Sequence, residues 1–563
     1  MRIVIVGGVA AGMSAAARAR RLDEEAEIIV LEKGSYVSFA NCGLPYYVSG
    51  EIEKSDDLVL QTAHSMHDAL TVDVKVGHEV VGLDGDAKTV RVKIATEEFD
   101  LPYDALVLAP GADAVRPDIP GIDSPRVVTL RTVHDAVQMR AMVDQGAKSA
   151  VVLGAGFIGL EAAEGLRDQG LDVTVVELGD HVLPPFEAEL TPIMRSELEK
   201  LGIKVREKVC ADAIEVGEDQ DTVVLADGTR IPADLVVLST GVRPATRVFE
   251  DAGVACERGA ILVDEHGKTS IPGVWAGGDA VASKNPVTGD LRPVPLAGPA
   301  NRAGRLIADS IIKGDEARPI PEPLGTAVVR VGDLTGALTG ANRQTLDAAG
   351  IEYHTLNLHP TQHVTYFPGA REMHLVVHFE DGTGRILGAQ GVGQKGIDKR
   401  IDVFATAIRG GLAINDLIDT DLAYSPPYGA AKDGVNMAGM MGENVLDGVT
   451  DLWYAEDLPE AMQVCLIVDC RRPDEYAGGH IPGALNVPHT QVRGRIEEIR
   501  EAAAGRPIRV HCRSGMRSYI AERILKQEGF DVKNLSGGML TLKEAMAGGV
   551  TPPVKLVFGD SRE

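Results

Sequence analysis

The segment RIVIVGGVAAGMSAAARARRLDEEAEIIVLEKG, residues 2–34, decides the fold of the N-terminal part of the chain. Its apolar run 3–6 predicts a buried parallel strand, and the alanine-rich stretch 13–21 predicts a helix. A second strand is expected over 28–31 and ends at Glu32. An acidic residue about 20 positions after a glycine turn is typical of a βαβ unit that binds a dinucleotide.

The glycine turn of this unit supplies the chemistry for binding a pyrophosphate. Gly7 and Gly12 let the backbone come close to the phosphates, and the N-terminus of the following helix adds partial positive charge. Glu32 can accept hydrogen bonds from ribose hydroxyls. Val9 stands where the fingerprint has its second glycine, so this copy departs from the pattern at one position.

A second copy of the same pattern follows about 147 positions later. A strand over 149–153 leads into GAGFIG (154–159), a helix over 160–168 and a strand over 173–176 that ends at Glu177. This copy matches the fingerprint fully. Two dinucleotide sites in one chain suggest one tightly held flavin and one exchangeable nicotinamide. Because the Glu177 carboxylate repels a 2′-phosphate, we expect NADH to be preferred over NADPH.

Composition sets the limits for the rest of the chain. At 563 residues and 59.7 kDa, we expect about three to four domains. The formal net charge of −26 argues against nucleic acid or an anionic membrane as the main partner. Six cysteines without zinc spacing predict neither a disulfide scaffold nor a metal site. The sequence has no signal-peptide pattern and no long apolar run, so we expect a soluble cytoplasmic protein.

The pattern changes from about residue 325. The alternation of strands and one helix there resembles an α+β interface domain more than a third nucleotide fold. The Met/Gly-rich stretch 436–442 looks like the start of a linker, and a small separate α/β domain follows. The elements expected in this half are strands over 326–331, 373–379, 466–469 and 508–511 and helices over 401–408 and 519–527.

Cys42 is the first candidate redox residue. It lies in SFANCGLPY (38–46), directly after the first βαβ unit, where the chain is expected to pass close to a flavin ring. The neighbouring Asn, Gly and Pro favour a shaped loop over a buried structural cysteine, which is the usual alternative. No second cysteine follows within six residues, so Cys42 has to act alone, as a sulfenate or as a mixed disulfide with an external thiol.

Cys512 is the second candidate. It lies in VHCRSGMRS (510–518) between a predicted strand and a predicted helix, where backbone N–H groups and the helix dipole stabilise a thiolate. Arg513 and Arg517 add positive charge. A phosphatase loop is the alternative, but there cysteine and arginine are six positions apart. The spacing of five found here suits sulfur better than phosphate.

With these motifs in view, residues 1 to about 445 resemble the coenzyme A-disulfide reductase branch of the pyridine nucleotide-disulfide oxidoreductases. The resemblance is carried by IVIVGGVAAG, SFANCGLPYY, GAGFIGLEAAE, VWAGGDA, VPLAGPANRAGR and AYSPPYGAAKD. Residues from about 455 onward resemble a rhodanese domain through VDCRRPDEYAGGHIPGALNVP, HCRSGMRS and LSGGM. The fusion is similar to proteins some of which act as NADH-dependent persulfide reductases.

The resemblance implies a role for each matching position. Cys42 matches a redox cysteine that forms a mixed disulfide with coenzyme A, and Tyr366 and Tyr424 match a tyrosine pair that reaches this sulfur from the partner subunit of a homodimer. Implied positions of the coenzyme A groove are Ser14, Arg18, Arg21, Ser38, Asn41 and Lys432. Implied FAD positions are Gly7, Gly8, Val9, Ala10, Ala11, Gly12, Glu32, Lys33, Ala109, Asp279, Pro295, Leu296, Ala297 and Gly298. Further implied cofactor-binding positions are Asn41, Val80 and Arg131. Implied NADH positions are Gly154, Gly156, Phe157, Ile158, Gly159, Glu177 and Gly241.

The expected fold class is α/β, with two Rossmann-like dinucleotide-binding domains, an α+β dimerisation domain and a small α/β rhodanese domain. The FAD-binding domain is expected to be discontinuous. The expected bounds are 1–110 and 241–324 for FAD binding, 111–240 for NADH binding, 325–445 for dimerisation, 446–456 for a linker and 457–563 for the rhodanese domain.

The function expected from these features is FAD-dependent reduction of a coenzyme A disulfide, persulfide or polysulfide by NADH through Cys42. In the rhodanese domain, Cys512 would carry a sulfane sulfur. Two alternatives stay open: an NADH oxidase or peroxidase in which Cys42 cycles through a sulfenate, and a slow sulfur carrier or redox sensor. The tyrosine pair and the rhodanese domain argue against the oxidase, and no histidine stands near residue 10 as a peroxidase would need.

Overall fold

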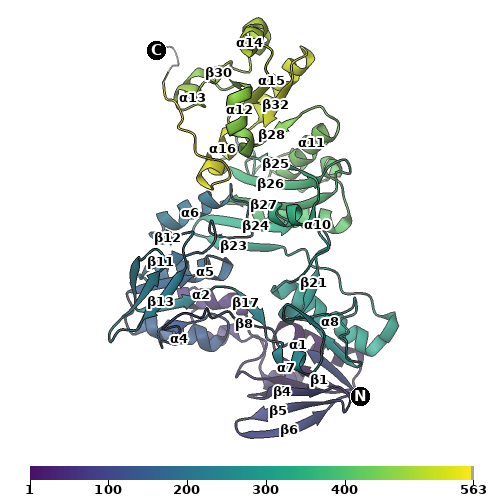
Figure 1. Ribbon diagram of the computed structural model, residues 1–563. Coiled ribbons are helices and arrows are strands. Elements are labelled where there is room, and N and C mark those ends of the chain that lie inside the picture. The colour runs from purple at the N-terminus through teal and green to yellow at the C-terminus, as the bar shows by residue number, and fades with distance from the viewer. Residues whose placement is uncertain (560–563) are drawn as a thin grey trace. The chain divides into compact units, whose positions relative to one another are not determined.

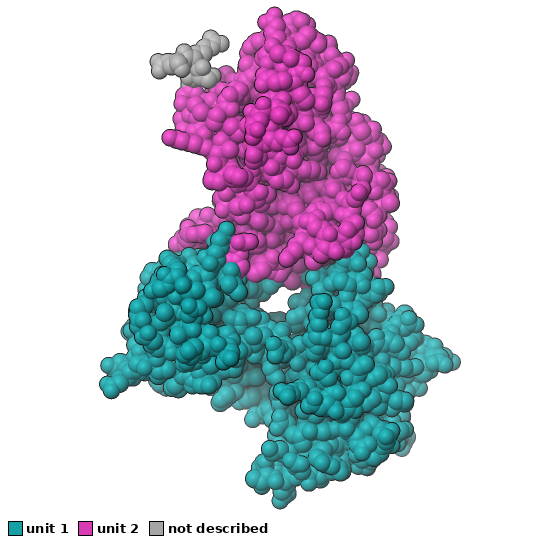
Figure 2. Space-filling view, viewed as in Figure 1, with its two compact units in different colours: residues 1–178, 201–325 teal, residues 179–200, 326–563 magenta. Residues whose placement is uncertain are grey.

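The computed structural model describes residues 1–559, which form two compact units (Figure 2). Unit 1 comprises residues 1–178 and 201–325. Unit 2 comprises residues 179–200 and 326–559. Unit 1 contains two parallel sheets, and unit 2 contains one.

The first parallel sheet of unit 1 contains the N-terminal strand, drawn in purple in Figure 1. Its strand order is β20-β7-β1-β2-β3. The bounds are β1 Arg2–Val6, β2 Glu27–Glu32, β3 Asp73–Val76, β7 Ala105–Leu108 and β20 Val274–Ala276. Ile3 pairs with Ile28 on one side and with Ala105 on the other. All four residues of β7 are buried, as expected for a central parallel strand.

Two helices pack closely beside this sheet. Helix α1 (Ala10–Leu22) follows the glycine turn, and helix α8 (Ala297–Lys313) packs against α1. A Cβ on Gly304 of α8 would lie 2.0 Å from the Ala11 carbonyl oxygen, so only glycine permits this approach.

The second parallel sheet of unit 1 repeats the construction. Its strand order is β12-β11-β10-β16-β9, and helix α5 (Phe157–Asp168) follows its glycine turn. The bounds are β9 Val127–Val128, β10 Ser149–Leu153, β11 Asp172–Val176, β12 Lys204–Arg206 and β16 Leu235–Leu238.

Antiparallel strands and shorter helices complete unit 1. The three-stranded sheets are β4 Glu79–Asp84, β5 Thr89–Ile94 and β6 Glu97–Pro102, and β13 Ala211–Glu215, β14 Asp221–Leu225 and β15 Arg230–Ala233. The two-stranded sheets are β8 Ala112–Ala114 with β17 Val242–Pro244, β18 Cys256–Glu257 with β19 Ala260–Ile261, and β21 Ala282–Lys284 with β22 Leu291–Pro293. The remaining α-helices are α2 Leu44–Ser49, α3 Ala63–Leu70, α4 Val133–Asp144 and α7 Arg247–Asp251.

Unit 2 contains an antiparallel sheet with strand order β23-β24-β27-β26-β25. Its bounds are β23 Ala327–Val331, β24 Leu334–Gly340, β25 Tyr353–Leu358, β26 Met373–Glu380 and β27 Ile386–Gly393. The same domain contains three α-helices: α9 (Arg343–Ala349), α10 (Ile397–Gly410) and α11 (Gly434–Leu446). The prediction that 436–442 begins a linker was wrong, because this stretch lies inside α11. Asp433 caps that helix, and Val435 and Ala438 are buried in the core of the sheet.

Residues 179–200 belong to unit 2, although they fall inside the range expected for NADH binding. Helix α6 (Thr191–Lys200) lies in this segment. Buried Glu187 accepts hydrogen bonds from Arg343 and pairs with His378 at 2.9 Å. Hydrogen bonds and ion pairs from His378 and Arg343 hold the pKa of Glu187 at about 2 against its burial, so a buried network joins this segment to the antiparallel sheet.

The C-terminal part of unit 2 is a second small parallel sheet with strand order β28-β32-β31-β29-β30. Its bounds are β28 Leu452–Trp453, β29 Leu466–Asp469, β30 Leu485–Asn486, β31 Ile508–His511 and β32 Val532–Leu535. Its helices are α12 Leu458–Val464, α13 Pro473–Ala477, α14 Ile496–Ala503, α15 Met516–Gln527 and α16 Gly538–Ala547. The range 446–456, expected as a linker, includes β28, whose Trp453 is fully buried in this domain.

The predicted fold class is confirmed: two dinucleotide-binding sheets, an antiparallel α+β domain and a small parallel α/β domain. The predicted strands are present. Helices α1, α5 and α15 each begin three residues before the predicted start, because each glycine turn passes directly into the helix. Within residues 1–559, no helix is long and apolar enough to cross a membrane.

Candidate functional site

The first glycine turn has the geometry that close phosphate approach requires. Gly7 adopts a positive φ of 97°, and a Cβ there would lie 2.0 Å from the Ala109 carbonyl oxygen. A Cβ on Gly12 would lie 1.9 Å from the Gly7 carbonyl oxygen, so glycine is required at both positions. Val9 has a negative φ of −117°, which any residue adopts, and this explains why a valine is accommodated there.

The second glycine turn repeats this geometry. Gly154 has a φ of 103°, and a Cβ on Gly159 would lie 2.1 Å from the Gly154 carbonyl oxygen. A Cβ on Gly156 or on Gly241 would meet no protein atom within 4 Å, so both face open space beside the helix N-terminus. Such an open cradle fits a bound dinucleotide, as expected for Gly156 and Gly241.

The two acidic residues occupy equivalent positions. Glu32 accepts hydrogen bonds from the N–H groups of Gly8 (2.8 Å) and Gly34 (2.6 Å). Glu177 accepts one from the N–H of Ala155 at 2.7 Å. Each carboxylate therefore stabilises its own glycine turn by hydrogen bonds. Each also lies at the C-terminal end of the second strand of its βαβ unit, where a ribose would bind.

Most of the other implied cofactor positions lie around these turns. Arg131 donates to the Ala112 carbonyl and pairs with Asp279 at 3.3 Å. Lys33 pairs with Asp113 at 3.3 Å, and Val80 is half-buried in β4. The segment 295–298 forms the start of α8, whose N-cap is Leu296. The exposed Ile158 and its neighbour Phe157 stand in the first turn of α5.

Cys42 lies between the two nucleotide-binding halves of unit 1. It belongs to the short 3₁₀ turn Asn41–Gly43 directly before α2, and it is exposed. Partial burial raises the pKa of the Cys42 thiol, and the charges of Glu161 and Asp279 raise it further. Glu161 stands on α5 beside the second glycine turn, while Asp279 follows β20. The Cys42 thiol is therefore within electrostatic reach of one carboxylate from each nucleotide-binding half.

Sequence reasoning missed Glu161, which also accepts a hydrogen bond from the Tyr46 hydroxyl at 3.2 Å. Its signal was present, since it is the glutamate of GAGFIGLEAAE, one turn into the helix that follows the glycines. What the sequence could not show is that α5 packs against α2, which directly follows the Cys42 turn, and that Glu161 thereby meets Tyr46, 115 positions away in sequence.

The residues expected to line the coenzyme A groove occupy helix α1 and the Cys42 loop. The Ser14 hydroxyl donates to Asn301 at 2.7 Å, and Arg18 pairs with Asp309 at 2.6 Å. Asn301 on α8 was not among the expected residues, although it lies in the quoted segment VPLAGPANRAGR. Ser38 adopts a left-handed backbone with a φ of 49°. Arg21, at the end of α1, is more exposed than its buried neighbour Arg20.

The structure brings Tyr366 and Tyr424 of unit 2 together, 58 positions apart in sequence. Their hydroxyls are 3.1 Å apart, and the side chains are 73% and 46% exposed. The hydrogen bond from Tyr366 raises the pKa of Tyr424. The Tyr424 phenol therefore stays protonated near neutral pH and is available as a donor to a ligand on this surface.

Two sets of polar contacts fix the position of the loop that carries Tyr424 and Lys432. Arg400 forms a buried ion pair with Asp433 at 2.5 Å and also donates to the Gln362 carbonyl (2.9 Å) in the Tyr366 loop. At the other end, the amide of Asn436 donates to the carbonyls of Leu417, Ile418 and Thr420.

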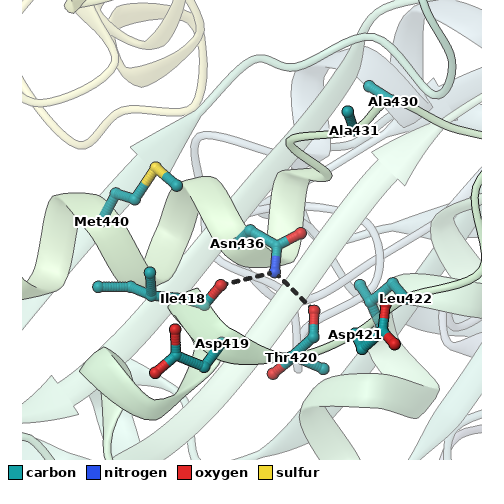
Figure 3. Close-up of a pocket in the computed structure, with 9 residues that line it drawn as sticks. All are labelled: Ile418, Asp419, Thr420, Asp421, Leu422, Ala430, Ala431, Asn436 and Met440. Atoms are coloured by element: carbon teal, nitrogen blue, oxygen red, sulfur yellow. Dashed lines mark hydrogen bonds between the residues drawn. The ribbon is translucent and has the colours of Figure 1, made fainter.

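A cavity of about 250 Å³ lies beside this second contact (Figure 3). Its lining includes Asp419 and Asp421 and no basic residue, so it does not suit a phosphorylated ligand. The feature relevant to function here is the loop that carries Tyr424, because its fixed position keeps Tyr424 beside Tyr366.

The Cys512 loop has the form of an anion-binding turn. Cys512 follows β31, and α15 begins four residues later with Gly515 as its N-cap. Two carbonyl groups of the loop accept backbone hydrogen bonds from the start of α16. Met539 N–H donates to Cys512 O (2.9 Å), and Leu540 N–H donates to Arg513 O (3.0 Å). A Cβ on Gly538 would lie 2.7 Å from Cys512 O, which explains the glycine pair of LSGGM.

The two loop arginines have different partners. Arg517 makes a double ion pair with Glu475 (2.7 and 2.8 Å), and hydrogen bonds to Glu475 and Cys512 raise its pKa. Arg513 instead makes a double ion pair with Glu372 of the antiparallel domain (2.7 and 2.8 Å). We expected both arginines to stabilise a sulfur anion, but in this structure only Arg517 is directed at Cys512.

Comparison with known proteins agrees with this organisation. The family description "Pyridine nucleotide-disulphide oxidoreductase" matches residues 1–300, its dimerisation domain matches residues 326–433, and a rhodanese-like domain matches residues 453–545. A coenzyme A disulfide reductase of Staphylococcus haemolyticus is 33% identical over 444 residues, covering 78% of this chain and 98% of that protein. An NADH oxidase of Methanocaldococcus jannaschii is 33% identical over 443 residues, with 78% and 98% covered.

Two solved structures match nearly the whole chain. Reduced CoADR-RHD of Bacillus anthracis is 38% identical, with a TM-score of 0.94 and 99% of both chains covered. A NAD-dependent persulfide reductase from A. fulgidus is 37% identical, with a TM-score of 0.88, covering 96% of this chain and 100% of that chain. Both matches extend through the Cys512 domain.

Proposed function

Since the chain belongs to the pyridine nucleotide-disulphide oxidoreductase family, we propose that it reduces a coenzyme A disulfide, persulfide or polysulfide with electrons from NADH. Its cofactors are FAD and NADH, held by the first and second glycine turns respectively. Its C-terminal domain acts as a rhodanese, a sulfurtransferase that works through Cys512. Both parts of the chain would therefore act on sulfur–sulfur bonds.

The placement of Cys42 carries this proposal. The thiol is exposed and lies within the electrostatic reach of Asp279 on the flavin side and Glu161 on the nicotinamide side. FAD, when bound, accepts electrons from NADH and makes them available to sulfur. Of the six cysteines, Cys42 alone has this position, and no second cysteine follows it in the loop, so the substrate sulfur itself completes the disulfide.

The chain's own residues prepare the substrate. Ser14, Arg18 and Arg21 bind the phosphorylated part of coenzyme A, because cationic side chains pair with phosphate. The chain acts as a homodimer in which Tyr366 and Tyr424 of the partner subunit reach Cys42. Their hydroxyls donate hydrogen bonds to the thiolate that leaves when the sulfur–sulfur bond breaks.

The test is a steady-state NADH assay with coenzyme A persulfide and coenzyme A disulfide as substrates. Cys42→Ser is expected to abolish both reductions while slow NADH oxidation by oxygen persists. Cys210→Ser, which removes a half-exposed cysteine of the same unit, is the control and should keep full activity. Normal persulfide reduction by Cys42→Ser would refute the electron path through this sulfur.

The same assay separates the two alternatives. Rapid NADH oxidation by oxygen or peroxide, with little by the persulfide, would identify an NADH oxidase or peroxidase. Little NADH turnover with prompt sulfur transfer from Cys512 to an acceptor protein would identify a sulfur carrier.

A further inference from the structure

A second cysteine lies beside Cys512 in the rhodanese domain. Cys470 follows β29 and Cys512 follows β31, and these strands are hydrogen-bonded neighbours whose last register pair is Asp469 with His511. The N–H of Cys470 donates to the His511 carbonyl at 2.8 Å. In a parallel ladder this is the hydrogen bond of the next pair, so Cys470 and Cys512 stand opposite each other.

The two side chains also share one face of the sheet. Val468, Cys470, Val510 and Cys512 are buried in the same apolar cluster, while Ile467 belongs to the cluster on the other face. Neighbouring strands are about 4.8 Å apart, and a disulfide joins Cα atoms about 4.4–6.8 Å apart. Backbone placement therefore allows a bond between the two sulfurs.

The electrostatics place the two sulfurs in one site. Complete burial raises the pKa of Cys470 well above its usual value, and the neighbouring Cys512 raises it further. Arg517 acts in the opposite direction on the pKa of Cys470, and its own pKa is raised in part by the nearby Cys512. Cys470 is thus a thiol in the resting protein, and it is held next to the sulfur of Cys512.

We propose that Cys470 resolves the persulfide of Cys512 by forming an intramolecular disulfide, Cys470–Cys512. The proposal rests on the proposed function in one respect, that Cys512 carries a sulfane sulfur. The sulfur of Cys470 attacks the sulfur of Cys512 that is bonded to the protein. The persulfide bond breaks, and the outer sulfur leaves as hydrosulfide, which takes up the thiol proton and departs as hydrogen sulfide.

This step balances without an external oxidant. The outer sulfane sulfur is reduced to sulfide, and the two cysteine sulfurs are oxidised to the disulfide. Two equivalents of a small thiol reopen the disulfide and restore both cysteines. A loaded domain without an acceptor would therefore release its sulfur and close, which protects Cys512 from further oxidation.

The test uses the full-length holoenzyme and measures intact mass and tryptic peptides after loading with thiosulfate. The wild type is expected to gain the mass of one sulfur atom transiently, then to lose it with hydrogen sulfide release and end two hydrogens lighter than the reduced protein. A peptide linking Cys470 to Cys512 should appear, and dithiothreitol should remove it. In Cys470→Val and Cys470→Ser the sulfur is expected to stay on Cys512.

Cys465→Ser is the matched control, because Cys465 is a buried cysteine of the same domain in the cluster on the other face. It should behave as the wild type does. A parallel arm oxidises the unloaded protein with diamide, which requires no sulfurtransferase activity and should also produce the linked peptide.

The outcomes separate this proposal from the proposed function. A linked peptide with diamide but no sulfur uptake from thiosulfate would support the cysteine pair and refute the sulfurtransferase activity. A persulfide that persists equally in the wild type and in both Cys470 variants would overturn the resolving role. Absence of the linked peptide in both arms would do the same.

Discussion

Replacing Arg517 by lysine is expected to slow sulfur transfer much more than the same change at Arg513. Arg517 uses two N–H groups on Glu475, at 2.7 and 2.8 Å, and its guanidinium also interacts electrostatically with the nearby Cys512. A lysine ammonium lacks the planar fork that makes both contacts in one geometry. The loop would then lose the donor that Arg517 offers to the anion formed when Cys512 carries a sulfane sulfur.

The expected size follows from these contacts. A hydrogen bond to a charged group contributes roughly 1.5–3 kcal/mol, which corresponds to a loss of about 10- to 150-fold in rate. Arg513 pairs with Glu372 at a site where the arginine side chain is 50% exposed. Exposed pairs contribute about 0–1 kcal/mol, so Arg513→Lys should lower the rate by at most about fivefold.

The assay is thiocyanate formation from thiosulfate and cyanide, with NADH-dependent reduction of coenzyme A disulfide as the internal control. Reductase activity and thermal unfolding should be close to the wild type in both variants. Equal losses for Arg517→Lys and Arg513→Lys would refute the assignment of Arg517 alone to Cys512. An undiminished rate in Arg517→Lys would refute any role of this guanidinium in holding the anion.

Two further predictions concern the nicotinamide site and the C-terminal domain. Glu177→Gln keeps the shape of the side chain that accepts the hydrogen bond from Ala155 but removes the charge facing the ribose. The ratio of kcat/KM for NADPH to that for NADH should therefore rise by about tenfold, as expected for removal of roughly 1.4 kcal/mol of repulsion. Initial rates with both nucleotides check this, and an unchanged ratio would contradict it. Burial raises the pKa of Glu522, which binds Thr450 and the Asp451 N–H, from 4.5 to about 7. A carboxyl whose pKa is higher in the folded than in the unfolded state favours folding at low pH, so the wild type should lose up to about 3 kcal/mol between pH 4.5 and 7 through this group. Glu522→Gln should lack that loss in a comparison of Tm against pH, and parallel curves for the two proteins would show the reasoning to be wrong.

Much of the fold could be predicted because its signals are local. Each βαβ unit is encoded in about 30 consecutive residues, in which apolar runs, glycines and a terminal acid follow a fixed order. The Cys512 loop is encoded in the same way, as a cysteine between a strand and a helix with an arginine five positions on. The boundaries were less accurate, since the stretch 436–442 has a flexible composition and yet lies in a buried helix capped by Asp433.

What the sequence determined by itself was the set of local structures that present chemistry: two glycine turns, an exposed cysteine after the first of them, and a cysteine at a helix N-terminus. Tertiary structure alone decided which distant groups meet these: Glu161 and Asp279 at Cys42, Glu372 at Arg513, and Cys470 at Cys512. Backbone periodicity and turn geometry depend on neighbours along the chain, so they can be predicted from consecutive residues of the sequence. Partners across strands and helices depend on register and packing, which arise only when the whole unit has buried its core.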